Sequence, residues 1–187
     1  MIEQKFFPGY LFDLDGVLID SMQQHTEAFR LALDQYNLLL GDVEIAGRST
    51  MEIIEEVQLS YPDDEIPIVE LVVLKQTIAR DLIKIAGQEI LFPHVDEVLL
   101  RLTSVSKVGI CTSGSRSSLE FFLSLISSAI KFDVLLCADD VTHSKPDPEI
   151  YLKGASRLGV ATKHVLVVED SLSGIKAGLL AGCQVAQ

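Results

Sequence analysis

The sequence predicts an α/β fold in which a doubly wound, Rossmann-like parallel sheet carries an inserted all-helical cap domain. Short apolar runs alternate with helical patterns in the second half of the chain, as in parallel sheets covered by helices on both faces. Residues 21–91 break this alternation and show helical periodicity alone, directly after the first apolar run. We therefore expect an α/β core formed by residues 1–20 and 92–187 and a helical cap formed by residues 21–91.

The expected strands are apolar without interruption, which is typical of strands buried on both faces. They are rich in Val, Ile and Leu and lie at 10–13, 108–112, 134–138, 165–168 and in the final CQVAQ. Helices are expected at 115–127, 148–158 and 171–181. Pro148 and Ser171 mark helix starts, and Gly159 and Gly182 follow helix ends.

Three helices are expected in the inserted segment. The first carries apolar or aromatic positions every three or four residues: Met22, His25, Phe29, Leu33 and Tyr36. The second begins after GRST, with Ser49 or Thr50 as N-cap and Glu52 in the first turn. A turn at YPDDEIP leads to a long third helix over 68–86, which ends at Gly87.

Composition excludes several classes of partner. The chain has 187 residues, is 48% hydrophobic and carries a net charge of −12. This charge argues against binding nucleic acids or anionic membranes, which needs clustered Lys and Arg. The three cysteines show no metal-binding spacing and lie in apolar runs, as reduced, buried thiols do. With no signal peptide and no apolar run of membrane-spanning length, we expect a cytoplasmic protein, with a monomer favoured.

Two aspartates in LFDLDGVLIDS are the first candidates for a reaction centre. Asp13 and Asp15 point to the same side where the first strand ends, because side chains at i and i+2 share a face. Carboxylates this close repel each other unless a cation or a shared proton offsets the cost. Ligands of open α/β sheets bind beyond the carboxyl ends of the strands, where later strands deliver 112–114 and 169–170.

These strand ends favour magnesium and phosphate. Carboxylates at positions 13, 15, 169 and 170 are the hard oxygen ligands that Mg²⁺ prefers. Lys145 and the backbone N–H groups of 112–115 suit phosphate oxygens. The inventory predicts phosphoryl transfer to a carboxylate.

Four segments resemble the motifs of the haloacid dehalogenase-like hydrolase superfamily: FDLDGVLIDS, CTSGS, SKPDPEIY and VVEDSLSGIKAG. The similarity is to its phosphatase and β-phosphoglucomutase branch, which carries a helical cap between the first two motifs. It covers essentially the whole chain. Members usually continue with more strand, loop and helix beyond AGCQVAQ, where this sequence ends at Gln187.

The resemblance implies a role for each matched residue. Asp13 is similar to the nucleophile that becomes an aspartyl phosphate, and Asp15 to the general acid and base. Thr112 resembles the hydroxyl that holds the transferring group, and Lys145 the lysine that pairs with the nucleophile and the phosphate. The implied oxyanion donors are the backbone N–H groups of Leu14, Ser113 and Gly114. The implied Mg²⁺ ligands are Asp13, the Asp15 carbonyl and Asp170, with Glu169 assisting.

The cap is expected to select the substrate. His25 aligns with a histidine of the β-phosphoglucomutase branch, but a packed core residue is an equal alternative on its helical face. Arg48 and Lys75 are candidates for a second phosphate or an acidic substrate group; the preferred alternative is that both are solvated. β-Phosphoglucomutases carry G-x-S-R at this loop, whereas this chain has Gly47-Arg48-Ser49-Thr50, which favours a phosphatase.

The expected function is that of a Mg²⁺-dependent phosphatase acting on a small phosphorylated metabolite, of which a sugar phosphate is the preferred class. The first alternative is a β-phosphoglucomutase-like phosphomutase. A phosphoacceptor signalling domain would not need Asp15 and has no insert of this length. A catalytically dead binding protein is the remaining alternative, and the intact motifs disfavour it.

Overall fold

The fold is that of a computed structural model, which describes residues 6–45, 48–62 and 65–187. The chain divides into two compact units. The sheet unit comprises Met1–Asp20 and Leu91–Gln187, and the helical unit comprises Ser21–Ile90. Leu91 pairs with Ile19 in an isolated antiparallel bridge, so it belongs to the sheet unit, one residue earlier than the expected boundary.

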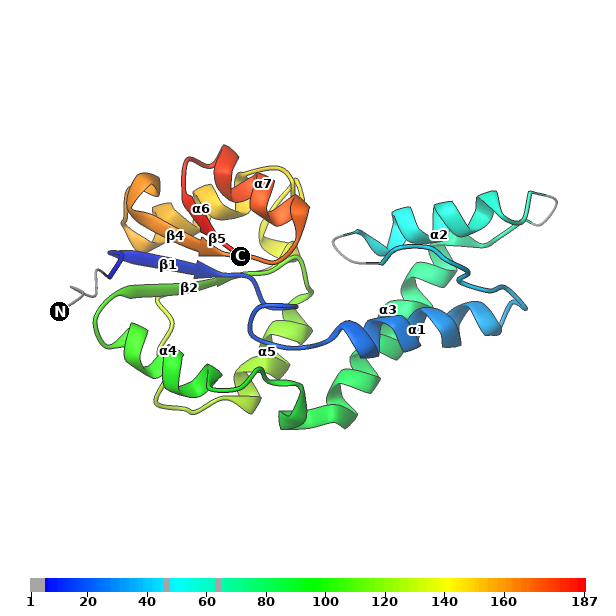
Figure 1. The fold of residues 1–187 in the computed structure, drawn as a ribbon, viewed down its shortest axis with the longest axis horizontal. Coiled ribbons are helices and arrows are strands. Elements are labelled where there is room, and N and C mark those ends of the chain that lie inside the picture. The colour runs from blue at the N-terminus through cyan, green and yellow to red at the C-terminus, as the bar shows by residue number, and fades with distance from the viewer. Residues whose placement is uncertain (1–5, 46–47, 63–64) are drawn as a thin grey trace. The chain divides into compact units, whose positions relative to one another are not determined.

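The sheet unit contains a five-stranded parallel sheet in the order β3-β2-β1-β4-β5 (Figure 1). The central strand β1 (Gly9–Phe12) pairs with β2 (Lys107–Cys111) and with β4 (Val165–Val168). The edge strands are β3 (Val134–Leu136) and β5 (Gln184–Ala186). The sheet confirms the predicted doubly wound α/β class.

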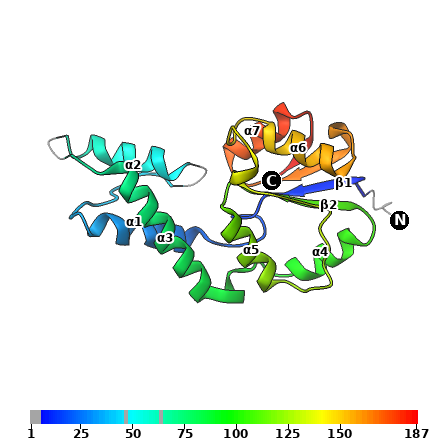
Figure 2. The same ribbon diagram turned by 180° about the vertical axis from the view of Figure 1, so that it is seen from behind.

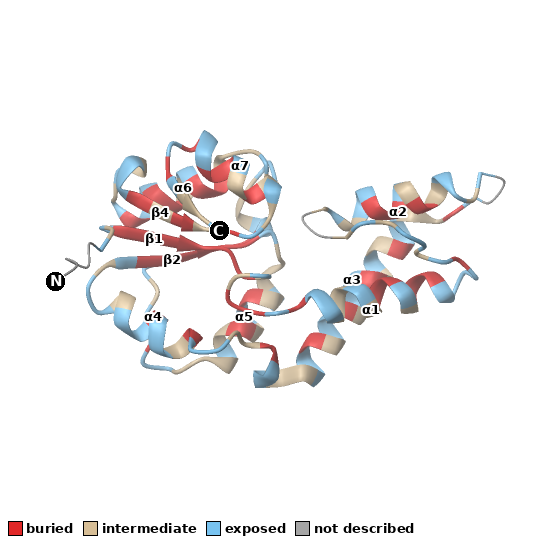
Figure 3. Cartoon of the chain, viewed as in Figure 1, coloured by how far each residue is buried: buried red, intermediate tan, exposed pale blue. Residues whose placement is uncertain are grey.

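Helices cover both faces of this sheet. Helices α4 (Val95–Thr103) and α5 (Arg116–Leu125) lie on one face, and α6 (Glu149–Leu158) and α7 (Leu172–Leu180) lie on the other (Figures 1 and 2). The central strands are almost wholly buried between these layers, which explains their uninterrupted apolar sequences (Figure 3).

Helix α4 is an element that the sequence interpretation missed. Its buried positions Val95 and Leu99 follow helical spacing, and Asp96 and Glu97 lie in its first turn. The third strand is also shorter than expected, because Ala138–Asp140 turns into the 3₁₀ helix η2. A further 3₁₀ turn, η3 (Thr162–His164), precedes β4.

The helical unit contains α1 (Met22–Asp34), α2 (Thr50–Leu59), α3 (Ile68–Ala86) and the 3₁₀ helix η1 (Gly87–Ile90). Ser49 and Glu52 form a capping box at the start of α2, as their spacing indicated. Ser21 is the N-cap residue of α1 and makes no side-chain cap bond there. Gly47, and Asp63 and Asp64 of the expected turn, lie outside the described residues. Among the described helices, none is long and apolar enough to cross a membrane.

Candidate active site

Strand register brings the candidate residues to one edge of the sheet. Phe12 is aligned with Ile110 of β2 and with Val168 of β4, so the residues that follow these strands lie at similar heights. Three backbone bonds extend the ladders past the strands: Asp13 N to Val168 O, Thr112 N to Leu136 O, and Glu169 N to Ala186 O. Asp13, Thr112 and Glu169 are all buried. Each is therefore held by backbone bonds as well as by its side chain.

Lys145 forms the centre of the site. Its Nζ atom donates to Asp13 Oδ1 at 2.6 Å, to Glu169 Oε1 at 2.5 Å and to the Cys111 carbonyl at 3.0 Å. The side chain is only 4% exposed. An ammonium group has three protons, and these three acceptors can use all of them. The arrangement allows a positive charge to remain in a buried place beside Asp13.

Both carboxylate oxygens of Glu169 accept hydrogen bonds. Oε1 accepts from Tyr151 Oη at 2.9 Å as well as from Lys145. Oε2 accepts from the backbone N–H and the hydroxyl of Ser171, both at 3.0 Å. Neither Tyr151 nor the Ser171 hydroxyl was singled out for the site from sequence. The Tyr in SKPDPEIY and the Ser in EDS are the only sequence signals that pointed to them.

Burial and mutual contact shift the pKa values of both Asp13 and Lys145. Burial raises the pKa of Asp13 to about 7; Glu169 adds to the rise, while Lys145 opposes it. Burial alone would lower the pKa of Lys145, but Asp13 and Glu169 outweigh it and raise the pKa. Lys145 therefore stays charged, and a second cation near Asp13 would favour the ionised carboxylate.

Asp15 and Thr112 both approach Gly114 at the same edge. A Cβ atom built on Gly114 would lie 3.2 Å from Thr112 Oγ1 and 3.8 Å from Asp15 Oδ2. A cavity of about 140 Å³ lies next to Thr112, Ser113 and Lys145. One of the expected oxyanion donors, the N–H of Gly114, already has a hydrogen-bond acceptor. Gly114 N–H donates to Thr112 Oγ1 at 2.9 Å, so this bond would have to yield to a phosphate.

Of the remaining donors, Leu14 lies in the turn after β1 and Ser113 lies after β2. Leu14 has a fully buried side chain, and its carbonyl accepts from the N–H groups of Val17, Leu18 and Ile19. This turn fixes the backbone around Asp15 and Gly16. Gly16 has φ of +76°, a left-handed conformation that favours glycine. Ser113 is exposed at the start of the following loop.

The carboxylates fit a hard cation. Asp13, Glu169 and Asp170 each offer one oxygen atom, and these three atoms lie within 4.8 Å of one another. A Cβ on Gly16 would lie only 2.0 Å from Asp170 Oδ2, so the missing side chain leaves the space that this carboxylate occupies. Asp170 is exposed as a whole residue, but partial burial of its carboxyl group, together with Glu169, raises its pKa. Such an oxygen donor set is the kind that Mg²⁺ prefers.

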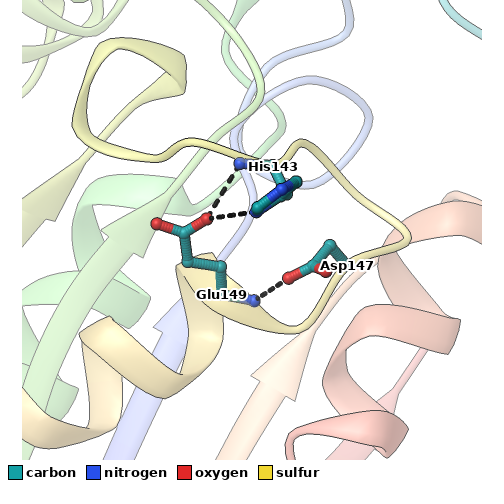
Figure 4. A group of neighbouring side chains, drawn as sticks. All are labelled: His143, Asp147 and Glu149. Atoms are coloured by element: carbon teal, nitrogen blue, oxygen red, sulfur yellow. Dashed lines mark hydrogen bonds and ion pairs between the residues drawn. The ribbon is translucent and has the colours of Figure 1, made fainter.

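A second group of ligand-type side chains lies in the loop before α6. His143, Asp147 and Glu149 approach one another there (Figure 4). Glu149 already accepts from the backbone N–H groups of Thr142 and His143 and from Lys153 Nζ at 2.6 Å. Asp147 Oδ1 accepts from the N–H of Glu149 at 2.9 Å. These bonds brace the loop that carries Lys145.

The three candidates from the insert all lie in the helical unit. Lys75 Nζ lies 3.0 Å from His25 Nδ1 and 4.4 Å from the centroid of the Phe29 ring. Lys75 is 5% exposed, which corrects the expectation of a solvated side chain. Its long apolar stem and the ring of Phe29 explain how it can be buried. Arg48 forms an ion pair with Glu56 at 2.5 Å.

Several known proteins are similar in sequence to this chain. The family model for haloacid dehalogenase-like hydrolases matches residues 7–182. The chain is 29% identical over 178 residues to validoxylamine A 7′-phosphate phosphatase of Streptomyces hygroscopicus subsp. limoneus, covering 92% of this chain and 81% of that protein. It is 30% identical over 202 residues to the phosphoglycolate phosphatase of Escherichia coli (strain K12), covering 94% and 78%.

A solved structure gives a similar result. The β-phosphoglucomutase of Clostridium difficile has 25% sequence identity and a TM-score of 0.75, covering 96% of this chain and 83% of that one. The family match spans nearly all of the chain, and the motifs FDLDGVLIDS and VVEDSLSGIKAG lie within it. The chain therefore belongs to the haloacid dehalogenase-like hydrolases, in the phosphatase and β-phosphoglucomutase branch that its motifs resemble.

Proposed function

We propose that the protein is a Mg²⁺-dependent phosphatase that hydrolyses a small phosphorylated metabolite, a sugar phosphate in the first instance, in the cytoplasm and as a monomer. The observation that carries the proposal is the buried contact between Lys145 and Asp13, 2.6 Å long, at the carboxyl edge of a parallel sheet. An ammonium placed there can neutralise both a carboxylate nucleophile and the phosphoryl group that it attacks. The named phosphatases among the relatives support the same class of reaction.

Asp13 is the nucleophile in this proposal. One of its oxygens attacks phosphorus, the bond to the leaving oxygen breaks, and an aspartyl phosphate forms. Asp15 gives a proton to the leaving oxygen and later takes one from the water that hydrolyses the aspartyl phosphate. Thr112, with the N–H groups of Leu14 and Ser113, binds the phosphoryl oxygens.

Asp13, the carbonyl of Asp15 and Asp170 would hold Mg²⁺. When bound, the ion supplies positive charge to the carboxylates and the phosphate. Glu169 is assigned a different part. Its oxygens are committed to Lys145, Tyr151 and Ser171, so its effect on the metal is indirect.

A phosphomutase is the second candidate. The similarity to a β-phosphoglucomutase structure and the contact of His25 with Lys75 in the helical unit favour it. Both candidates share the aspartyl phosphate and differ in what accepts the phosphoryl group. A phosphatase gives it to water, whereas a mutase returns it to a sugar hydroxyl.

One experiment tests both candidates. Purified protein with Mg²⁺ is screened against phosphorylated metabolites, and released phosphate and isomerised sugar phosphate are measured in the same sample. Phosphate release without isomer supports the phosphatase, and isomer formation primed by a bisphosphate supports the mutase. Binding without either product would favour a non-catalytic protein and overturn the proposal.

A further inference from the structure

Tyr151 lies directly behind the proposed reaction centre. It is in the first turn of α6, and its side chain is fully buried. Gly154, almost one turn further on, allows α6 to approach the sheet closely. A Cβ atom at Gly154 would lie 2.8 Å from side-chain atoms of both Leu11 and Cys111. This close packing sets the ring of Tyr151 against the strand ends that carry the site.

Tyr151 contacts both members of the ion pair between Lys145 and Glu169. Its hydroxyl donates to Glu169 Oε1 at 2.9 Å, the same oxygen that Lys145 Nζ contacts. Its ring centroid lies 4.9 Å from Lys145 Nζ, within the range of a cation–π contact. One side chain thus fixes the acceptor of Lys145 through its hydroxyl and attracts the ammonium itself through its ring.

The hydroxyl is a donor here and not an acceptor. Burial and the nearby carboxylates Asp13 and Glu169 raise the pKa of Tyr151 well above its usual value, so the phenol keeps its proton. Glu169 needs this donor because its side chain has no exposure to water. If the hydroxyl were lost, Glu169 would lose one of the bonds that fix its carboxylate, and the ammonium that this carboxylate holds beside Asp13 would be fixed less firmly.

We infer that Tyr151 is a positioning residue for phosphoryl transfer: acting through Glu169, it holds the ammonium of Lys145 against the carboxylate of Asp13. The consequence for catalysis rests on the proposed function, but the contacts do not. A purely structural tyrosine would fill the core beside Leu11 and Cys111 and would be replaced by phenylalanine without consequence.

Tyr151→Phe separates these two roles, because it removes one oxygen atom and keeps the ring and the packing. Tyr10→Phe is a matched control. Tyr10 is also buried in the sheet unit, and its hydroxyl accepts from the N–H of Phe7 at 3.1 Å, before β1 begins. Both substitutions remove one hydrogen bond. Only the first removes a bond to the Lys145 network.

The first measurement is independent of enzymatic activity. Trace labelling with acetic anhydride, followed by mass spectrometry, reports how tightly each lysine amine is held. Lys107, whose side chain is 59% exposed, serves as the internal reference. We expect Tyr151→Phe to raise labelling of Lys145 relative to Lys107 by roughly tenfold, by analogy with the lower end of the loss seen when a hydrogen-bond partner of a metal ligand is removed. Tyr10→Phe should leave the ratio unchanged.

Two further variants keep this measurement decisive. Tyr151→Leu removes the ring contact as well and should raise the ratio further. Glu169→Gln weakens the same link and should raise it even if Tyr151→Phe folds poorly. An unchanged ratio in Tyr151→Phe, or in Glu169→Gln if the first variant does not fold, would overturn the inference.

The second measurement is hydrolysis of p-nitrophenyl phosphate with Mg²⁺. We expect Tyr151→Phe to lower kcat by about tenfold with little change in KM, since Lys145 acts on the transferring group. Tyr10→Phe should retain the wild-type kcat. A wild-type protein without activity would contradict the proposed function, and the labelling ratio would still decide the role of Tyr151. An active wild type with an unchanged kcat in Tyr151→Phe would overturn the inference.

Discussion

Gly16 makes room for Asp170: a Cβ at position 16 would lie 2.0 Å from Asp170 Oδ2. Gly16→Ala therefore displaces this carboxylate, and it also strains the backbone, since φ at Gly16 is +76°. We expect the variant to bind Mg²⁺ at least about tenfold more weakly, as measured by calorimetry, and to lose about 1–2 kcal/mol of unfolding free energy.

Gly41→Ala is the matched control for this prediction. Gly41 also has a positive φ, of +64°, but a Cβ there would meet no atom within 4 Å. It should share the backbone cost and leave the affinity for Mg²⁺ unchanged. Equal Mg²⁺ affinities in Gly16→Ala and Gly41→Ala would show that Asp170 is not a metal ligand.

Asp170 and Glu169 are adjacent acids with different expected roles. Asp170→Asn removes the exposed carboxylate that we propose as a metal ligand, and it should raise the Mg²⁺ concentration needed for half-maximal activity by roughly 10–100-fold. Glu169→Gln weakens the hold on Lys145 and should lower kcat even at saturating Mg²⁺. Metal titration of both variants distinguishes them, and the opposite order would reverse the two assignments. Activity that survives exhaustive chelation would exclude the metal altogether.

The sequence predicted most of the sheet because the strands that form it are buried on both faces. Val165–Val168 lies at its expected bounds, and the long helix Ile68–Ala86 does too, since both have sharp ends in sequence. Helix Val95–Thr103 has apolar residues at helical spacing but is only nine residues long, and it was missed. Short helices of this kind depend on packing more than on local pattern.

The sequence placed Asp13 and Glu169 in motifs at strand ends, and the register of β1 and β4 brings them to one edge of the sheet. Lys145 comes from the loop before α6 and contacts both of them. The hydroxyl of Tyr151 reaches Glu169 across 18 residues, from a helix to a strand end, and no spacing rule gives such a contact. The burial of Lys75 could not be predicted from the sequence either, because it depends on Phe29 in another helix of the same unit.

Lys75 and Arg48 differ in burial within the helical unit: Lys75 is buried, whereas Arg48 is partly exposed. Lys75→Met keeps most of the buried volume and removes the charge. If the ammonium contacts substrate, we expect KM to rise roughly tenfold for the preferred sugar phosphate and to change little for p-nitrophenyl phosphate. Arg48→Met should mainly remove the ion pair with Glu56, which is partly exposed and therefore contributes little to stability. Equal losses on both substrates would assign Lys75 a structural role.

Glu149 predicts a pH dependence of stability. Lys153 and the N–H groups of Thr142 and His143 lower the pKa of Glu149 from 4.5 to about 2 in the folded protein. The unfolded chain binds the proton more tightly, so this stabilisation is complete above about pH 4.5 and disappears as the pH falls toward 2. Glu149→Gln should lower Tm at pH 7, and the difference from wild type should narrow below pH 4.5. Glu120→Gln, on exposed α5 surface, is the control; a difference that stays constant with pH would contradict the prediction.

Substitutions of Asp13 and of Asp15 are expected to block different steps of the proposed reaction. Asp13→Asn removes the nucleophile, so no phosphoenzyme should form from any donor. Asp15→Asn keeps the nucleophile and removes the acid and base, and turnover of an unactivated sugar phosphate should fall by about 10²–10⁴-fold. Acetyl phosphate has a good leaving group and needs little protonation. It should still phosphorylate Asp13 in the Asp15→Asn protein.

Hydrolysis of that aspartyl phosphate then needs the base that Asp15→Asn lacks. The variant should therefore accumulate phosphoprotein, seen by mass spectrometry as one added phosphoryl group on Asp13 after a mildly acidic quench. Wild-type protein treated in the same way should carry far less label, because it retains Asp15 as the proposed base. Label on Asp13→Asn, or full activity of Asp15→Asn on an unactivated ester, would show that the nucleophile and the acid–base residue are wrongly assigned.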